Sequence, residues 1–371
     1  MPIGFAVTLG LFALCTAAAL FRTRHFGRTV YMTTVVINEL PQVASLCLIL
    51  SAGLAWVEGD LVGGPGLVLS VLTMVVLTGH VELARRGISA GSAVGRALTD
   101  AGITAATASR VRLLRPLLAP LPIRPRSVRR VRNVAYGPHR LQRLDVYRRR
   151  GAAVRGTLVY LHGGGYSSGR KHWEARALLH HFASEGWVCI SADYRLRPGA
   201  GIADHLDDAR SVVTWAHAHA GDHGGDPGTL VMVGSSAGAH LTALCALTQE
   251  DQPDRGASRI DAAVGLYGYY GPYDGADRSA GPVSSPLRLR AASAPPFFLV
   301  HGDHDSWVPV ELAREFVRHL RADSRQAVVY AELPGAQHGF DLFRSWRFTA
   351  VLTGLDAFVR NLPGSARTGP G

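Results

Sequence analysis

The amino-acid sequence predicts an α/β protein: a three-layer sandwich around a mostly parallel, eight-stranded sheet, preceded by N-terminal transmembrane helices. Three observations indicate this class. From about residue 130 onward, short apolar runs alternate with stretches of helical pattern, which is typical of a sheet covered by helices on both faces. A Gly-x-Ser-x-Gly turn joins one of these runs to a helix. Before residue 82, three long runs contain no charged side chain.

The apolar runs at the N-terminus have the length of membrane spans. Ile3–Phe21 is uncharged over 19 positions, and as a helix it would extend about 28 Å, close to the hydrocarbon thickness of a bilayer. Leu40–Val57 and Leu61–Val81 follow, and the second run is the weakest because it is short and contains Pro41. We expect two or three transmembrane helices rather than apolar core helices or a re-entrant pair. A cleaved signal peptide is disfavoured, since no Lys or Arg precedes the first run.

Arginine is concentrated after these runs. The chain has a formal net charge of +11, and residues 82–155 alone hold 17 Arg against three acidic residues. A basic surface beside a membrane attracts anionic lipid headgroups, although it can equally be a solvated face that follows the positive-inside rule. No aromatic residue lies between Leu83 and Ala135 to stack on bases. We therefore expect the membrane as a partner, through the N-terminal helices, and no nucleic acid.

The positions of the charges also predict an orientation. Arginines follow the first and third apolar runs, whereas only Glu58 and Asp60 separate the second from the third. Because cytoplasmic loops are enriched in Lys and Arg, this pattern predicts a protein of the cell membrane whose C-terminal domain is cytoplasmic. The runs carry no acidic or Arg side chain of the kind that lines an ion path, which argues against a channel or transporter. The sequence does not predict an oligomeric state.

Composition divides the chain into four parts. Residues 1–84 form the membrane region. Residues 85–127 form a basic, Arg/Pro-rich linker and candidate lid, because the prolines between residues 110 and 132 exclude a continuous helix. Residues 128–362 form the α/β domain, and residues 363–371 a disordered tail. The four cysteines show no spacing typical of a disulfide framework or a zinc site, and we expect no metal and no cofactor.

The α/β domain contains eight runs with strand pattern, most of them wholly apolar, as in strands buried on both faces of a parallel sheet. These runs are Val128–Tyr136, Leu141–Tyr147, Thr157–Leu161, Val188–Ala192, Leu230–Val233, Ala262–Tyr267, Phe297–Val300 and Val328–Leu333. The helical stretches include His172–Ser184, Ala203–His219, Ala237–Leu247 and Val310–Arg321.

Ser236 is the candidate nucleophile. It is the central residue of Gly234–Gly238, which follows one predicted strand and opens the helix at Ala237. A sharp turn in this context holds the serine oxygen clear of the sheet, and the helix N-terminus behind it offers N–H groups to a developing oxyanion. A simple connecting turn rich in Gly and Ser is the alternative, which the placement between strand and helix disfavours.

A run of glycines directly follows another predicted strand. In His162–Gly165 the glycines allow backbone N–H groups to converge on one point, which in a serine hydrolase is the substrate carbonyl oxygen. A phosphate-binding loop is the competing interpretation, but the G-K-[ST] ending of a P-loop is missing. We expect His162 to hold the loop rather than to carry protons.

Asp305 and His338 complete a candidate triad. Asp305 lies on the loop after the seventh predicted strand and His338 on the loop after the eighth, in the chain order Ser, Asp, His. A carboxylate on the first loop can orient the imidazole. Asp303 competes for this role, and either aspartate could instead cap the helix that begins near Pro309.

Together these motifs resemble the hormone-sensitive lipase family of α/β-hydrolases, and in particular membrane-anchored esterases and lipases of actinobacteria. The resemblance rests on motifs in the order His162–Gly165, Asp193–Leu196 with Pro198, Gly225–Pro227, Gly234–Gly238, His301–Pro309 and His338. It implies that Asp305 is the triad aspartate. It also implies that the N–H groups of Gly164, Gly165 and Ala237 form the oxyanion hole.

Some residues near the motifs depart from the family pattern or allow two roles. Ser235 stands where family members often have an acidic residue, and Ala239 where they often have glycine. Tyr166, Trp307 and Phe340 either line an apolar pocket or pack in the core. The segment between the sixth and seventh strands is short, so we expect a lid to come largely from residues before Val128.

The resemblance and the motifs imply a serine carboxylesterase or lipase that cleaves acyl or lipid esters through an acyl-enzyme, with Ser236 as nucleophile, His338 as base and Asp305 as its orienting carboxylate. An amidase, a formamidase or an acyltransferase would use the same triad. A catalytically silent binding protein on the same fold is the alternative from another class.

Overall fold

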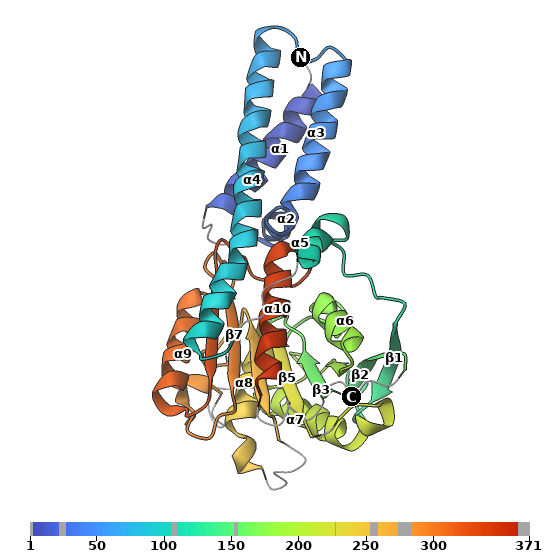
Figure 1. Ribbon diagram of the computed structural model, residues 1–371, viewed down its shortest axis with the longest axis vertical. Helices are drawn as coiled ribbons and strands as arrows, with labels where there is room; N and C mark the ends of the chain where they lie inside the picture. Colours follow the sequence, from blue (N-terminus) through green and yellow to red (C-terminus); the bar gives the residue numbers. More distant parts are fainter. Residues whose placement is uncertain are drawn as a thin grey trace.

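The computed structural model describes residues 3–21, 27–104, 110–151, 155–226, 228–252, 259–273 and 284–362. A bundle of long helices extends from one end of an α/β domain (Figure 1). The tail expected over residues 363–371 lies outside the described residues.

One eight-stranded sheet forms the centre of the α/β domain. Its strands are β1 (Val128–Ala135), β2 (Arg143–Arg149), β3 (Thr157–Leu161), β4 (Val188–Ala192), β5 (Leu230–Ser235), β6 (Ala262–Leu266), β7 (Phe297–Gly302) and β8 (Val328–Leu333). They are ordered β1-β2-β4-β3-β5-β6-β7-β8. β2 is antiparallel to both of its neighbours, β1 and β4. All other neighbouring strands, from β4 through β3 to β8, pair in parallel. The predicted fold class is confirmed.

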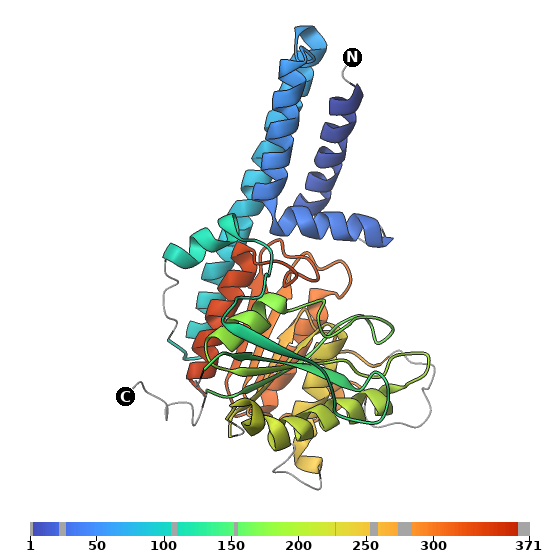
Figure 2. The same ribbon diagram turned by 90° about the vertical axis from the view of Figure 1, so that its right-hand side faces the viewer.

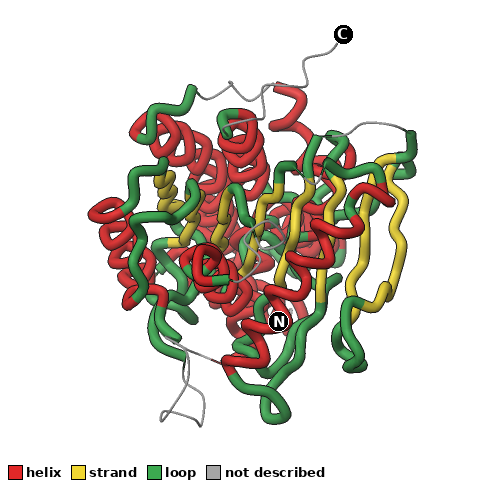
Figure 3. Tube along the Cα trace, turned by 90° about the horizontal axis from the view of Figure 1, so that it is seen from below, coloured by secondary structure: helices red, strands yellow, loops and turns green. Residues whose placement is uncertain are grey.

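Helices cover both faces of this sheet (Figure 3). The helices of the domain are α6 (Arg176–Ser184), α7 (Ile202–His219), α8 (Ala237–Leu247), α9 (Val310–Asp323) and α10 (Trp346–Arg360). α6 and α10 pack on one face, and α7, α8 and α9 on the other. Along β3, Leu158 and Tyr160 belong to the first core and Val159 and Leu161 to the second, because side chains alternate along a strand.

Most predicted elements are found within a few residues of their expected ends. The main difference is α6, which begins at Arg176 rather than at His172. Ala175 has a φ of 49°, in the left-handed region, so the chain cannot enter the helix before it. β5 and β7 continue two residues beyond the apolar runs that predicted them.

Four helices form the N-terminal part: α1 (Ile3–Leu20), α2 (Gly27–Glu39), α3 (Pro41–Val57) and α4 (Gly63–Asp100). α1 and α4 are each long and apolar enough to cross a membrane. α2 and α3 are bent by 95° at their junction and count as a third candidate only if the pair is one span. Two or three spans therefore agree with the helices present.

α4 continues without a break past residue 84, where the linker was expected to begin. It runs for 38 residues to Asp100. In its second half Leu83, Ala90, Val94 and Leu98 are buried at helical spacing, and this face packs on α10 and β8. The stretch contains no proline and is rich in alanine, leucine and arginine, which favour helix. The candidate membrane segment and the sheet are thus joined by one helix (Figure 1).

The rest of the expected linker contains a short helix. α5 spans Arg110–Leu118 and ends two residues after Pro116, so the prolines limit the helix without excluding it. Arg344 N–H then donates to the carbonyl of Pro120 at 2.7 Å, which fixes the following segment to the domain.

α2 was not predicted from the sequence. It lies across the base of the other N-terminal helices, between them and the α/β domain (Figure 2). Asn38 Nδ2 donates to the carbonyl of Gly335 at 2.8 Å. Glu39 is fully buried and forms an ion pair with the buried guanidinium of Arg347 while accepting from Ser345 Oγ at 2.6 Å. These contacts attach α2 to the loops at the carboxyl ends of the strands.

Candidate active site

Ser236 occupies a strained turn between β5 and α8. Its φ is 53° and its ψ −114°, a combination that L-residues rarely adopt. The Ser236 N–H donates to the carbonyl of Leu266 at 2.9 Å, which ties the turn to β6. The following turn of helix passes so close to β3 that a Cβ at Gly238 would lie 2.1 Å from the carbonyl oxygen of Leu161. This close approach explains the last glycine of the motif.

The glycine loop after β3 has its own support. Gly164 has a φ of 111°, and a Cβ there would lie 2.2 Å from the carbonyl oxygen of Ser168. His162 stacks on Tyr194 with ring centroids 4.5 Å apart, and Tyr194 Oη donates to the His162 carbonyl at 2.9 Å. His162 therefore holds the base of the loop.

Asp305 and His338 are in direct contact. Asp305 Oδ2 lies 2.7 Å from His338 Nδ1. The other carboxylate oxygen accepts the N–H groups of Trp307 and Val308, each at 2.8 Å, so the same side chain also fixes its own loop. Asp305 is 4% exposed and lies behind the imidazole. Its competitor Asp303 instead accepts the N–H of Gly335 at 2.6 Å.

The sequence-predicted residues meet at one cavity of about 620 Å³. We call it the serine cavity. The candidate nucleophile, base and oxyanion donors all line it: Ser236, His338, Gly164, Gly165 and Ala237. Residues from three separate loops, those after β3, β5 and β8, are thus brought to the same end of the sheet, where the parallel strands end, as in other open α/β sheets.

The charges around His338 affect its proton affinity. Burial opposes the charged imidazolium, but the carboxylates of Asp305, Glu174 and Asp341 raise the pKa of His338 above its usual value. Burial alone would likewise raise the pKa of Asp305, yet His338 and His301 hold it well below its usual range. The pair is therefore arranged as a carboxylate beside an imidazole, as a base that must accept a proton requires.

A network of buried polar side chains lies beside the candidate nucleophile Ser236, and sequence reasoning missed it. Asp341 accepts from Tyr267 Oη at 2.6 Å, from Ser235 Oγ at 3.3 Å and from the N–H of Ala175 at 3.0 Å. Tyr160 Oη donates to Ser235 Oγ at 3.0 Å. A carboxylate is thus present beside position 235 although the residue at that position is serine.

Glu174 connects this network to the glycine loop. Its Oε2 accepts the N–H of Gly163 at 2.7 Å and lies 3.3 Å from the hydroxyl oxygen of Tyr160. Burial, followed by the charge of Asp341, raises the pKa of Glu174. Glu174 also lines the serine cavity. Its position before a helix, without a family motif, gave no sequence signal.

Aromatic side chains shape the serine cavity. Tyr166 lines it while its hydroxyl donates to His240 Nδ1, and Trp307 lines it with half of its surface exposed. Phe340 is fully buried and belongs to the core. Of the two predicted roles, Tyr166 shows both, since it is also buried in a core cluster, whereas Trp307 lines the cavity and Phe340 packs in the core.

The residues that cover the serine cavity are not those of the expected lid, residues 85–127. The cavity's N-terminal lining residues are Tyr31 and Met32 of α2, and no described residue of 85–127 lines it. Tyr31 Oη donates to the carbonyl of His338 at 2.8 Å, and its ring makes an edge contact with Trp307. Tyr269 and Tyr273, from the segment after β6, also line the cavity.

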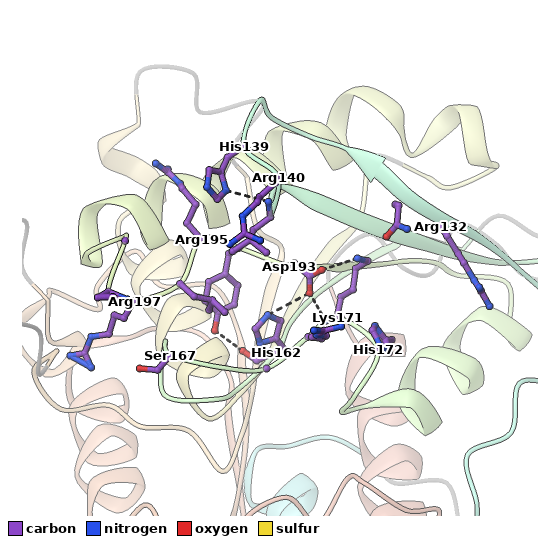
Figure 4. Close-up of a pocket in the computed structure, with 18 of the residues that line it drawn as sticks. Arg132, His139, Arg140, His162, Ser167, Lys171, His172, Asp193, Arg195 and Arg197 are labelled. Carbon is purple, nitrogen blue, oxygen red and sulfur yellow. Dashed lines mark hydrogen bonds and ion pairs between the residues drawn. The ribbon is translucent and has the colours of Figure 1, made fainter.

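A second cavity, of about 940 Å³, adjoins the first (Figure 4). It shares Gly169 and Arg197 with the serine cavity, and basic side chains dominate its lining. We call it the basic pocket. Several of these side chains are paired: Lys171 Nζ lies 2.7 Å from Asp193, and Arg195 binds the buried carboxylate of Asp208 at 2.7 Å. The Lys171–Asp193 pair lies next to the glycine loop, since Asp193 also lies 3.7 Å from His162 Nε2, whereas the Arg195 pair joins its segment to α7.

The fold and the site define the chain as an α/β-hydrolase. Residues 144–274 match the family described as BD-FAE. This match and the relatives below support the similarity to α/β-hydrolases of the hormone-sensitive lipase type that the motifs predicted.

Two curated relatives come from Mycobacterium tuberculosis. One, described as the probable carboxylic ester hydrolase LipM, is 35% identical over 64% of this chain and 62% of its own. The other, esterase LipC, is 36% identical over 62% of this chain and 65% of its own. The chain thus spans slightly less than two thirds of the length of these relatives.

A solved structure with the same fold is esterase 2 of Thermogutta terrifontis with butyrate bound. It is 25% identical, with a TM-score of 0.53, and the match covers 64% of this chain and 96% of that one. The same esterase has also been solved after phosphorylation by paraoxon.

Proposed function

We propose that this protein is a serine carboxylic ester hydrolase, a carboxylesterase or lipase. The observation that carries the proposal is the meeting of Ser236, on its strained turn, with His338 at one cavity, while His338 Nδ1 lies 2.7 Å from Asp305. The descriptions of the relatives as ester hydrolases support the same activity.

In the proposed reaction Ser236 Oγ attacks the ester carbonyl carbon. His338 accepts the serine proton and passes it to the leaving alcohol, which departs and leaves an acyl-enzyme. Asp305 holds the imidazole in the required tautomer. A water molecule then gives a proton to His338 and attacks the acyl carbon; the bond between that carbon and Ser236 Oγ breaks, His338 returns the proton to Oγ, and the carboxylic acid leaves.

The oxyanion of each tetrahedral intermediate is assigned to three backbone N–H groups, those of Gly164, Gly165 and Ala237. All three residues line the serine cavity. Such donors are fixed before reaction, and losing one typically costs about 2.7–4 kcal/mol of transition-state stabilisation. α8 begins at Ala237, so its N-terminal dipole adds to this stabilisation.

We further propose that the protein resides in the cell membrane, with α1, α4 and the bent α2–α3 pair as the membrane region and the α/β domain on the cytoplasmic side. The apolar lengths of α1 and α4 support the anchoring. The arginines after the first and third apolar runs support the orientation.

The test is hydrolysis of p-nitrophenyl butyrate by the full chain in vesicles, with Ser236→Ala as control. Turnover that requires Ser236 is expected, together with inactivation by paraoxon and a matching mass increase on the peptide that contains Ser236. Transfer of the acyl group to an added alcohol in preference to water would indicate an acyltransferase. Full activity of Ser236→Ala, or a folded wild type that neither turns over nor reacts with paraoxon, would contradict the proposal.

A further inference from the structure

An apolar groove lies between the N-terminal helices, beside the serine cavity. It measures about 370 Å³. α1, α2 and α3 each contribute to its lining: Leu11, Phe12, Cys15, Met32, Thr33, Val36, Ile37, Leu40, Val43, Ala44 and Cys47. None of these side chains is charged, and only a threonine and two cysteines carry a polar atom. A site of this composition suits a hydrocarbon chain and no polar ligand.

The groove and the serine cavity meet at α2. Met32 lines both of them. One residue earlier, Tyr31 lines the serine cavity and donates to the carbonyl of His338 at 2.8 Å. On the same helix Val36 and Ile37, one turn further along, line only the groove. α2 therefore contacts the candidate base with one side and forms a wall of the groove with another.

The position of the groove on the bundle indicates how it would lie relative to a bilayer. α2 lies across the base of the bundle, whereas α1, α3 and α4 extend away from the α/β domain (Figure 2). α3 meets α2 at an angle of 95°. A helix at this place is parallel to the bilayer surface when its neighbours cross the bilayer. The groove then extends from the depth of the acyl chains to the level of the serine cavity.

We propose that the groove holds the acyl chain of a membrane-resident ester while its carbonyl group reaches Ser236. The inference rests on the proposed ester hydrolase function and names its substrate class: lipids with a long acyl chain that remains in the bilayer during hydrolysis. An acyl chain that moves from the bilayer into the groove gains little from the hydrophobic effect, because both surroundings are apolar. The groove therefore acts by aligning the chain, so that the carbonyl arrives in an orientation suited to attack.

The test compares two esters with the full chain reconstituted in phosphatidylcholine vesicles. One is p-nitrophenyl palmitate embedded in the vesicles, and the other is p-nitrophenyl butyrate in the water. Val36→Trp and Val43→Trp fill the groove from α2 and from α3. Both valines are more than a third exposed, at 39% and 38%, so the larger side chains are accommodated without disturbing a core.

Each groove variant is expected to lower the ratio of kcat/KM for palmitate to that for butyrate by about tenfold or more, since small misplacements of a reacting group cost this much. Ile49→Trp is the matched control. Ile49 is 52% exposed on α3, and it lies outside the groove. Its ratio is expected to stay within about twofold of the wild type, because exposed sites away from contacts are tolerant.

The possible failures are distinguishable. An unchanged ratio in both groove variants, with hydrolysis that still requires Ser236, would overturn the groove as the acyl site and leave the ester hydrolase function intact. Cleavage of butyrate but not of the embedded palmitate by the wild type would also overturn the groove as the acyl site. Absence of hydrolysis of either ester by the wild type would instead contradict the proposed function itself.

Discussion

At the scale of single residues, local motifs and distant partners differ in how well the sequence predicts them. The strand-to-helix turn at Ser236 and the glycine loop lie where the motifs predicted such turns, because each motif adopts its conformation within a few positions. Asp341 was missed because its partner Ser235 is 106 positions away, and no motif joins them. Asp341 places a carboxylate beside Ser235, the position at which the resembling family often has an acidic residue, and only the fold shows this contact.

Glu174→Gln is expected to shift the acid limb of the pH profile of kcat/KM to lower pH. His338 must be unprotonated to act as base, so activity rises as the pH passes its pKa. Glu174 raises that pKa, and removing its charge lowers it. The amide oxygen of glutamine can still accept the N–H of Gly163, which preserves the loop. Glu315→Gln, on the exposed side of α9, is the control. A shift to higher pH would contradict this electrostatic role of Glu174.

Asp341→Ala is expected to destabilise the fold strongly. It leaves the hydroxyls of Tyr267 and Ser235 and the N–H of Ala175 without this acceptor, and each unsatisfied buried donor costs about 1–3 kcal/mol. Asp341→Asn keeps one carbonyl oxygen as an acceptor and should lose less stability than Asp341→Ala. Thermal unfolding in detergent measures both variants. Equal unfolding temperatures for Asp341→Ala and the wild type would show that the network contributes no stability.

At the scale of elements, periodicity predicted the strands and most helices of the α/β domain, since each buries an apolar face. α2 escaped prediction because its sequence mixes polar and apolar residues for two different surroundings. Asn38 and Glu39 contact the α/β domain, whereas Val36 and Ile37 line the groove. The pattern of such a helix reflects partners that are themselves far away in the sequence.

Glu39→Ala is expected to lower the free energy of unfolding by about 3–5 kcal/mol, because Arg347 would be left as an uncompensated buried charge. Replacing both partners with apolar residues, as in Glu39→Leu with Arg347→Met, should cost less than the single change, since neither charge then remains buried. Unfolding of the two proteins in the same detergent makes the comparison. A double variant less stable than Glu39→Ala would argue against the buried ion pair as the cause.

At the scale of the whole molecule, the predicted architecture was confirmed while the junction between its two parts was not anticipated. The change from uncharged to Arg-rich sequence near residue 84 suggested a boundary, but it marks a change of surroundings within one helix. α4 keeps its helical spacing of buried residues across that point, from Val76 through Leu83 to Ala90. Composition reports what surrounds a segment, whereas the spacing of apolar residues reports its secondary structure.

The continuity of α4 sets the distance between the candidate active site and the proposed membrane. A helix of 38 residues extends about 57 Å at 1.5 Å per residue. If the proposed membrane region is correct and the apolar half of α4 lies in the bilayer, the other half of α4 holds Ser236 at one distance from the headgroups, whereas a flexible linker would let the domain sample a wide volume. On the proposed function, an ester at that depth would meet Ser236 at a high and constant effective concentration, and an ester dissolved in the water would gain no such advantage.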